Sequence, residues 1–344
     1  MAKLGGAKGF WDIIKSVSVA EIAREANRPL SVAVVGTPER RAEAMQRLFA
    51  AEEQARNAEV VKARALPEPP FVQGFDAMSE EAQFPRQAGV FDLVIDVGGG
   101  REGAPEGTLI YSVVELGGWE QTLDRILEDR PELALPLARN FPVFRKRVAQ
   151  RLITQTATAN AQFALVTGVA EALPITAILL PVNSLSDIVI LTKNQVMLTL
   201  RLAAAYGLSV DYKSRMKELA PILANAFGWR AIARELVGAV PFIGFLPRAM
   251  IAYAGTVTVG KAAQFYYETG ETVTTSQVKR LYQEAYEASR EKVRALAETL
   301  RGGRGGGGGG GRKRLPAKSG NGATPPEEAP PALEAEELAA NERE

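Results

Sequence analysis

Apolar residues in the first half of the chain fall in short continuous runs, separated by stretches with the spacing of a helix. Four runs predict buried strands, at residues 31–35, 59–66, 91–97 and 108–116. Residues 39–57 and 119–129 instead repeat apolar positions every third or fourth residue, which predicts helices. Strands that alternate with helices favour an α/β domain with a mainly parallel sheet.

Phe10, Trp11, Ile14 and Val17 recur at helical spacing before the first strand. Ser18, three residues before a glutamate, fits a capping box that opens a second helix ending near residue 26. The apolar stripe fits two interpretations. It packs on the following domain, or it lies in a membrane interface, where such helices place tryptophan and lysine.

From Pro142 onward the pattern changes to long helices with few strand features. Residues 163–182 carry a single charge, Glu171, and residues 236–260 carry only Arg248. Each stretch is long enough to cross a bilayer. The basic run at residues 145–151 would then anchor the first stretch on the cytoplasmic side.

A simple two-span hairpin conflicts with the positive-inside tendency, because it would export a basic loop. The basic residues of that loop are Lys193, Arg201, Lys213, Arg215, Lys217, Arg230 and Arg234. Two prolines also interrupt each apolar stretch, Pro174 and Pro181 in the first, Pro241 and Pro247 in the second. Two arrangements stay open: wedges that insert part-way into the inner leaflet or span the membrane with tilt, and a helical bundle with these segments as its core.

The end of the chain combines one amphipathic helix with a low-complexity tail. After Thr275, an apolar face formed by Val278, Leu281, Tyr282 and Ala285 predicts a helix with a solvated opposite side. Residues 301–344 are rich first in glycine and arginine, then in proline, alanine and glutamate, which predicts disorder. Arginine–glycine segments can contact RNA, but this short block lacks aromatic residues and fits a linker better.

The amino-acid composition excludes several classes of catalytic and metal-binding site. The 41 basic and 40 acidic residues leave a formal net charge of +1, so no global attraction to nucleic acid is expected. Cysteine and histidine are both absent. Their absence excludes disulfides, thiol nucleophiles, triad hydrolases and His-ligated zinc or haem sites. We expect no cofactor and no metal site.

The strand–Gly36–helix segment lies where a phosphate-binding loop would be expected. Such a loop needs a second glycine, a lysine and a hydroxyl in the pattern G-x4-G-K-[ST], because backbone amides, ammonium and magnesium all hold the phosphates. Here Arg41, Ala42 and Glu43 occupy those three positions. Pro38 also removes one backbone donor. Ordinary nucleotide hydrolysis is therefore not expected.

A partner motif survives in outline at the end of the third predicted strand. Asp96 and Gly99 satisfy D-x-x-G, the position at which nucleotide hydrolases hold magnesium through water. The same residues also fit ordinary turn chemistry. Gly36, Asp96 and Gly99 are the candidate remnants of a nucleotide site. The alternatives are a sheet end without ligand and an atypical anion site at the helix start that uses Arg40 or Arg41.

A family resemblance extends over roughly residues 148–270. The segments LPVNSLSDIVILTKNQVMLTLRLAAAYGL and FGWRAIARELVGAVPFIGFLPRAMIAYAGTVTVGKAAQFYYETG resemble the YcjF-like bacterial domain of unknown function. That domain is often fused behind a small Ras-like GTPase domain, and residues 10–36 resemble the lead-in to such a domain. The motif positions are Asn194, Gln195, Tyr206, Gly207, Pro241 and Gly244.

The resemblance implies a degenerate, truncated GTPase-like α/β domain followed by a helical, membrane-associated domain. We expect N-terminal amphipathic helices over 1–28, the α/β domain over 29–141, the helical domain over 142–300 and a disordered tail over 301–344. The helical domain is either membrane-embedded or a bundle. The family has no established reaction to carry over.

Three functions follow from these expectations. The first is a non-enzymatic adaptor or scaffold at the inner membrane, with a cytoplasmic α/β docking domain, a helical anchor and an unidentified protein partner. The second is a nucleotide- or anion-binding switch without hydrolysis. The third is a small transport or channel-like membrane protein. A homo-oligomer is compatible with each, and a cytoplasmic location is the alternative to the membrane.

Overall fold

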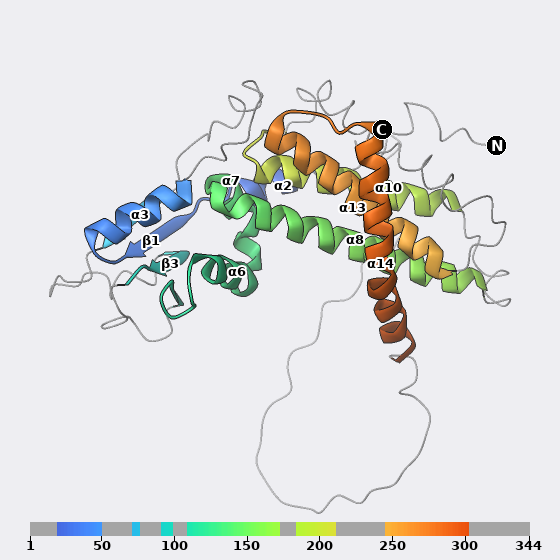
Figure 1. Cartoon of the computed structure of the whole chain (residues 1–344), viewed down its shortest axis with the longest axis horizontal. Helices are drawn as coiled ribbons and strands as arrows, with labels where there is room; N and C mark the ends of the chain where they lie inside the picture. Colours follow the sequence, from blue (N-terminus) through green and yellow to red (C-terminus); the bar gives the residue numbers. More distant parts are fainter. Residues whose placement is uncertain are drawn as a thin grey trace, which may run out of the picture. The chain divides into compact units, whose positions relative to one another are not determined.

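The computed structural model describes residues 19–49, 71–75, 91–98, 109–172, 184–210 and 245–302 (Figure 1). Several expectations lie outside these ranges: the helix around Trp11, the strand over 59–66, the residues Gly99, Pro241 and Gly244, and the tail from residue 303. Within the ranges the chain combines a small parallel sheet with many helices. The predicted combination of α/β and helical parts is therefore confirmed.

The sheet has four parallel strands in the order β2-β1-β3-β4. Their bounds are Ser31–Val35 for β1, Phe71–Phe75 for β2, Leu93–Asp96 for β3 and Ile110–Ser112 for β4. The central strand β1 pairs with two neighbours, so that Val32 lies opposite Val72 on one side and Leu93 on the other. The predicted parallel sheet is confirmed, whereas β2 was not predicted.

Successive residues of β1 contribute to two different apolar clusters, because side chains alternate across a strand. Val32 and Val34 belong to the main core, whereas Ala33 and Val35 form a small cluster with Val94 on the other face. All four side chains of β1 from Val32 to Val35 are buried. This double burial explains why the strand is a continuous apolar run rather than an alternating one.

Shorter helices precede the long ones, two of them beside the sheet and two beside the long helices (Figure 1). They are α2 (Val19–Ala26), α3 (Pro38–Phe49), α6 (Trp119–Asp129) and α7 (Ala134–Asn140), with the 3-10 turn η2 at Pro131–Leu133. The helix predicted to end near residue 26 and the helix predicted over residues 119–129 are confirmed, and the helix predicted over 39–57 is confirmed as far as Phe49. The buried face of α6 consists of Leu123, Ile126 and Leu127 together with Thr122. This spacing of three to four residues is that of an amphipathic helix.

Four long helices follow. They are α8 (Pro142–Ala172), α10 (Ser184–Ala205), α13 (Phe245–Thr269) and α14 (Thr275–Gly302). Helix α13 packs mainly against α8 and α14 and also contacts α10. At Gly260 the approach is close, since a Cβ there would lie 2.6 Å from Ile153 Cγ1. The predicted apolar face of α14 is confirmed: Val278, Tyr282 and Ala285 are buried.

Most buried apolar side chains form one continuous cluster. It contains Ile22 of α2, Val34 of β1, Leu123 of α6, Phe144 of α8 and Val293 of α14. The sheet and the long helices therefore share one hydrophobic core among the described residues.

No helix within the described ranges is both long enough and apolar enough to cross a membrane. The proline-flanked segments at 174–181 and 241–244 lie outside those ranges.

Arginines of the basic run at residues 145–151 contact neighbouring helices. Arg145 is buried and donates to the carbonyl of Ala138. Arg147 forms ion pairs with Glu120 and Asp124 of α6. These contacts tie the start of α8 to the helix that covers the sheet.

Candidate functional site

The carboxyl ends of β1 and β3 bring two of the predicted site residues together. Val35 lies opposite Asp96 in the sheet, and the amide of Val97 donates to the carbonyl of Val35 at 2.8 Å. Gly36 follows directly and is buried against Val97, because a Cβ on Gly36 would lie 2.6 Å from Val97 Cγ2. Glycine is thus required here for packing, because any side chain would clash with the neighbouring strand segment.

Asp96 is 3% exposed, and its carboxylate accepts a hydrogen bond from the backbone amide of Gly98 at 2.9 Å. Its carbonyl accepts from the amide of Val113 at 2.8 Å, which links β3 to the end of β4. An aspartate that bonds the amide two residues on forms an Asx turn. The local geometry therefore fits the turn interpretation of this motif.

Arg40, in the first turn of α3, covers the same edge of the sheet. Its Nη1 donates to the carbonyl of Val97 at 3.3 Å. A Cβ on Gly98 would lie 1.7 Å from that Nη1, so the guanidinium lies directly against the Gly98 backbone. Arg40 or Arg41 was expected to serve an atypical anion site. The Arg40 guanidinium holds the turn after β3, and the residue as a whole is exposed.

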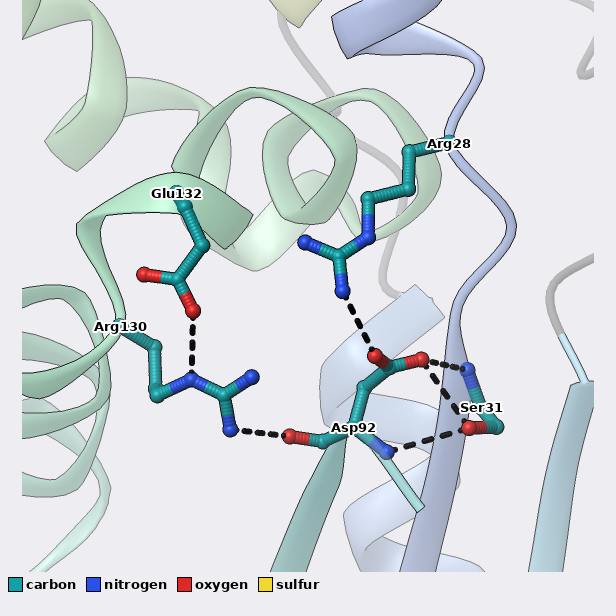
Figure 2. Close-up of polar contacts among 5 residues, drawn as sticks. All are labelled: Arg28, Ser31, Asp92, Arg130 and Glu132. Atoms are coloured by element: carbon teal, nitrogen blue, oxygen red, sulfur yellow. Dashed lines mark hydrogen bonds and ion pairs between the residues drawn. The ribbon is translucent and has the colours of Figure 1, made fainter. Parts of the chain in front are cut away.

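The opposite edge of the sheet carries a polar cluster that sequence analysis did not identify (Figure 2). The Asp92 carboxylate accepts from Arg28 Nη2, from the Ser31 amide and from Ser31 Oγ, each at 3.0 Å. The carbonyl of Asp92 accepts from Arg130 Nη1 at 2.8 Å. Asp92 therefore joins the start of β1, the start of β3 and the end of α6.

Glu132 completes this cluster by accepting from Arg130 Nε at 2.6 Å (Figure 2). That hydrogen bond lowers the pKa of the Glu132 carboxyl below its usual value. The Asp92 oxygens all have protein donors, so the cluster is suited to joining elements rather than to binding a ligand.

A second polar cluster, buried between the long helices, contains two of the residues predicted as motif positions. Asn194 Nδ2 donates to Asn160 Oδ1 at 2.7 Å, and Asn160 Nδ2 donates to Thr256 Oγ1 at 2.8 Å. Gln195 Nε2 also donates to Thr256 Oγ1, at 3.3 Å. Asn160, Gln195 and Thr256 are at most 1% exposed. We call these four residues the polar core cluster.

The polar core cluster links α8, α10 and α13, one or two residues from each. Thr256 Oγ1 accepts both amides while it donates to the carbonyl of Ala252 at 2.8 Å. Gln195 Oε1 is buried and accepts no hydrogen bond from the described residues. Buried amides need partners, so the cluster fixes the register of these three helices against one another.

Two further predicted motif positions, Tyr206 and Gly207, lie at the end of helix α10. Gly207 has φ = 80°, and the amide of Leu208 bonds back to Ala203 at 2.9 Å, as at many helix ends. Tyr206 is fully buried, and its hydroxyl donates to Glu268 Oε1 at 2.6 Å. Arg139 donates to the carbonyl of Leu208 at 2.9 Å, and burial lowers the pKa of this guanidinium.

The predicted residues therefore separate into three places: the sheet edge with Gly36 and Asp96, the polar core cluster with Asn194 and Gln195, and the end of α10. Asn160, Thr256 and Asp92 were missed, because nothing in the local sequence pattern shows which polar residues meet in the fold. Among the described residues, no group of three acidic side chains is placed to hold a metal ion. Comparisons of the chain with protein-family models, curated proteins and solved structures found no match.

Proposed function

We propose that this chain is a non-enzymatic adaptor at the inner membrane, with a degenerate GTPase-like domain as its docking part and the helical part as its anchor. The observation that carries the proposal is the position of Arg40, whose guanidinium lies against Gly98 and donates to the carbonyl of Val97. This is the edge at which a nucleotide-binding α/β domain holds its phosphates.

Two further features support a docking role over turnover. A phosphate loop offers a row of free backbone amides, a lysine and a hydroxyl. Here the Gly98 amide already donates to Asp96, and Arg41, Ala42 and Glu43 stand in the positions of glycine, lysine and hydroxyl. Hydrolysis would therefore lack both the phosphate cradle and the usual magnesium ligand.

Nucleotide binding by the full-length chain tests the docking role. Fluorescent GTP and ATP analogues, with and without Mg²⁺, should show no saturable binding, and neither nucleotide should be hydrolysed. Turnover that is abolished by Asp96→Asn would overturn the proposal. Saturable binding without turnover, lost in Arg40→Ala, would instead establish the anion-responsive switch.

The membrane part of the proposal rests on the two proline-flanked apolar segments of the sequence. The measurement is membrane fractionation with high-salt and carbonate washes. We expect the full chain to stay in the washed pellet, and we expect Leu179→Glu together with Phe242→Glu to release it. Ala295→Glu on the exposed side of α14 adds a negative charge away from the two apolar segments and serves as the control. Release of the unmodified chain by carbonate would contradict the anchor.

A further inference from the structure

A groove of about 370 Å³ lies between α8, α13 and α14. Its apolar lining comes from Ile153, Val257, Ala285 and Ala288. Ligand pockets have volumes of roughly 300–1,000 Å³, so the groove is large enough for a small organic ligand. Its apolar lining favours a ligand with a hydrocarbon part.

Hydrogen-bond donors from two helices converge on this groove. Tyr253 is 4% exposed, and its hydroxyl accepts from Lys292 Nζ at 3.0 Å. The hydrogen of that hydroxyl has no acceptor within the described part of the chain. Lys261, which lies two turns after Tyr253 on α13, also lines the groove and forms no ion pair with a described carboxylate. Two ammonium groups and a buried phenol are thus available to one ligand.

The charged side chains that line the groove give it a net positive charge. Lys261 and Lys292 contribute two positive charges and Glu284 contributes one negative charge, which leaves a formal sum of +1. Glu284 lies 3.8 Å from Arg280, its ion-pair partner one turn earlier in α14. Because Arg280 partly offsets the charge of Glu284, the groove is net positive and attracts an anion, and one negative charge balances the side chains that line it.

We propose that this groove binds a small carboxylate that carries a hydrocarbon chain. The carboxylate accepts from Tyr253 and from the ammonium groups of Lys261 and Lys292, and the chain lies against the apolar lining. Hydrogen bonds between charged groups are stronger than those between neutral groups, so they fix the orientation of the ligand. The proposal is independent of the adaptor function, because it uses neither the sheet edge nor the proline-flanked segments.

The test is calorimetric titration of the full-length chain with decanoate at concentrations below its micelle formation. We expect saturable binding of one decanoate per chain. Decanol and decyltrimethylammonium have the same hydrocarbon chain without the negative charge, and both should bind at least about tenfold more weakly. Equal binding of decanol and decanoate, or no saturable binding of decanoate, would overturn the proposal.

Three variants locate the site. Lys261→Gln combined with Lys292→Gln should raise the Kd for decanoate at least about tenfold. Ala288→Phe, at an exposed position, fills the groove without changing a charge and should also weaken binding. Arg290→Gln removes a charge from the same helix about 200° away from Lys292 and should leave the Kd unchanged. An unchanged Kd in both groove variants, with native thermal unfolding, would place decanoate elsewhere and refute this site.

Discussion

Two buried tyrosines show how single hydroxyl groups affect this fold. Tyr206 donates to Glu268 at 2.6 Å, whereas the hydroxyl of Tyr111 in β4 has no hydrogen-bond partner among the described residues. Both rings are at most 3% exposed. A buried polar group without a partner costs about 1–3 kcal/mol, and a hydrogen bond to a charged group contributes a similar amount. The same substitution should therefore have opposite effects at the two positions.

Tyr111→Phe is expected to raise the free energy of unfolding at neutral pH by about 1 kcal/mol, measured by urea denaturation. Tyr206→Phe should lower it by about 1.5–3 kcal/mol, since Glu268 loses a donor. Destabilisation by Tyr111→Phe would show that the hydroxyl has a partner after all.

The pH dependence of Tyr111 gives a separate check. Burial raises the pKa of its phenol above the ordinary 10.0. A raised folded-state pKa means that stability is complete below pH 10 and is lost as the pH rises from there through the folded-state value. The Phe variant lacks this ionisation, so its unfolding free energy should fall less steeply above pH 10. Parallel curves for the two proteins would contradict this assignment.

Substitution of Gly98 tests the contact between its backbone and the Arg40 guanidinium. Its φ of 115° disfavours alanine, and a Cβ would also displace the guanidinium from the Val97 carbonyl. Gly117 has φ = 87° and open space at its Cβ, so it shares only the backbone strain. Gly98→Ala should destabilise more than Gly117→Ala, by about 0.5–1.5 kcal/mol. The difference between the two glycine variants should disappear when each is combined with Arg40→Ala. Urea unfolding of the two single and the two double variants measures it.

At the scale of elements, the polar core cluster holds the long helices in register. Helix α13 is apolar around most of its circumference, so apolar packing alone allows it to slide or rotate against α8 and α10. The side-chain amides of Asn160 and Gln195 both donate hydrogen bonds to Thr256 Oγ1. A rotated or shifted helix would leave these amides unpaired, which gives the observed packing an advantage over its alternatives.

Thr256→Val should therefore cost about 2–4 kcal/mol in the free energy of unfolding, because two buried amides lose their acceptor. Thr258 offers a matched control: it is equally buried on α13, and its hydroxyl bonds only the carbonyl of Ala254, one turn earlier. Thr258→Val is expected to cost less than about 1 kcal/mol. Chemical denaturation of both variants measures the difference, and equal costs would mean that the cluster adds nothing.

The elements that sequence analysis predicted are those whose pattern is local. The run SVAVV is β1, and the helical period over residues 119–129 is α6, with matching bounds. Strand β2, with the sequence FVQGF, was missed because glutamine and glycine interrupt its apolar run. Its strand character comes from pairing with β1, 40 residues earlier at Ser31↔Phe71, and such pairing leaves no trace in a short window.

The candidate site was predictable to a similar extent. Gly36 and Asp96 were expected at one sheet edge and lie there. That Arg40 covers the edge depends on a rotamer, which the sequence pattern does not determine. Asn194 and Gln195 were singled out by family resemblance, but their partners Asn160 and Thr256 come from helices 34 and 61 residues away. Only the fold reveals that these four residues meet.

On the scale of the whole molecule, the shared core has consequences for unfolding. The domain boundaries expected from sequence divide the chain at residue 142, within a region where contacts are dense. Arg139 bonds the end of α10, and Arg147 pairs with α6. The buried cluster also includes residues from both sides of that position. Two separately stable parts would require this core to be divided.

We therefore expect the described ranges to unfold in one cooperative step. In native-state hydrogen exchange, the Val34 amide in β1 and the Ala254 amide in α13 should report the same opening free energy. Their dependence on urea should also coincide. A lower opening free energy at Val34 alone would instead support a separate α/β domain that ends near residue 141.

The contact between α2 and α10 also affects how the protein is made. Arg201 pairs with Glu25 at 2.5 Å across 176 positions of the chain. Translation adds about 5–20 residues per second, so the ribosome needs roughly 10–35 s to reach the partner after Glu25 is made. During that interval the newly made α2 has no α10 to pack against. The packing of α2 is therefore completed only late in synthesis, when most of α10 has been made.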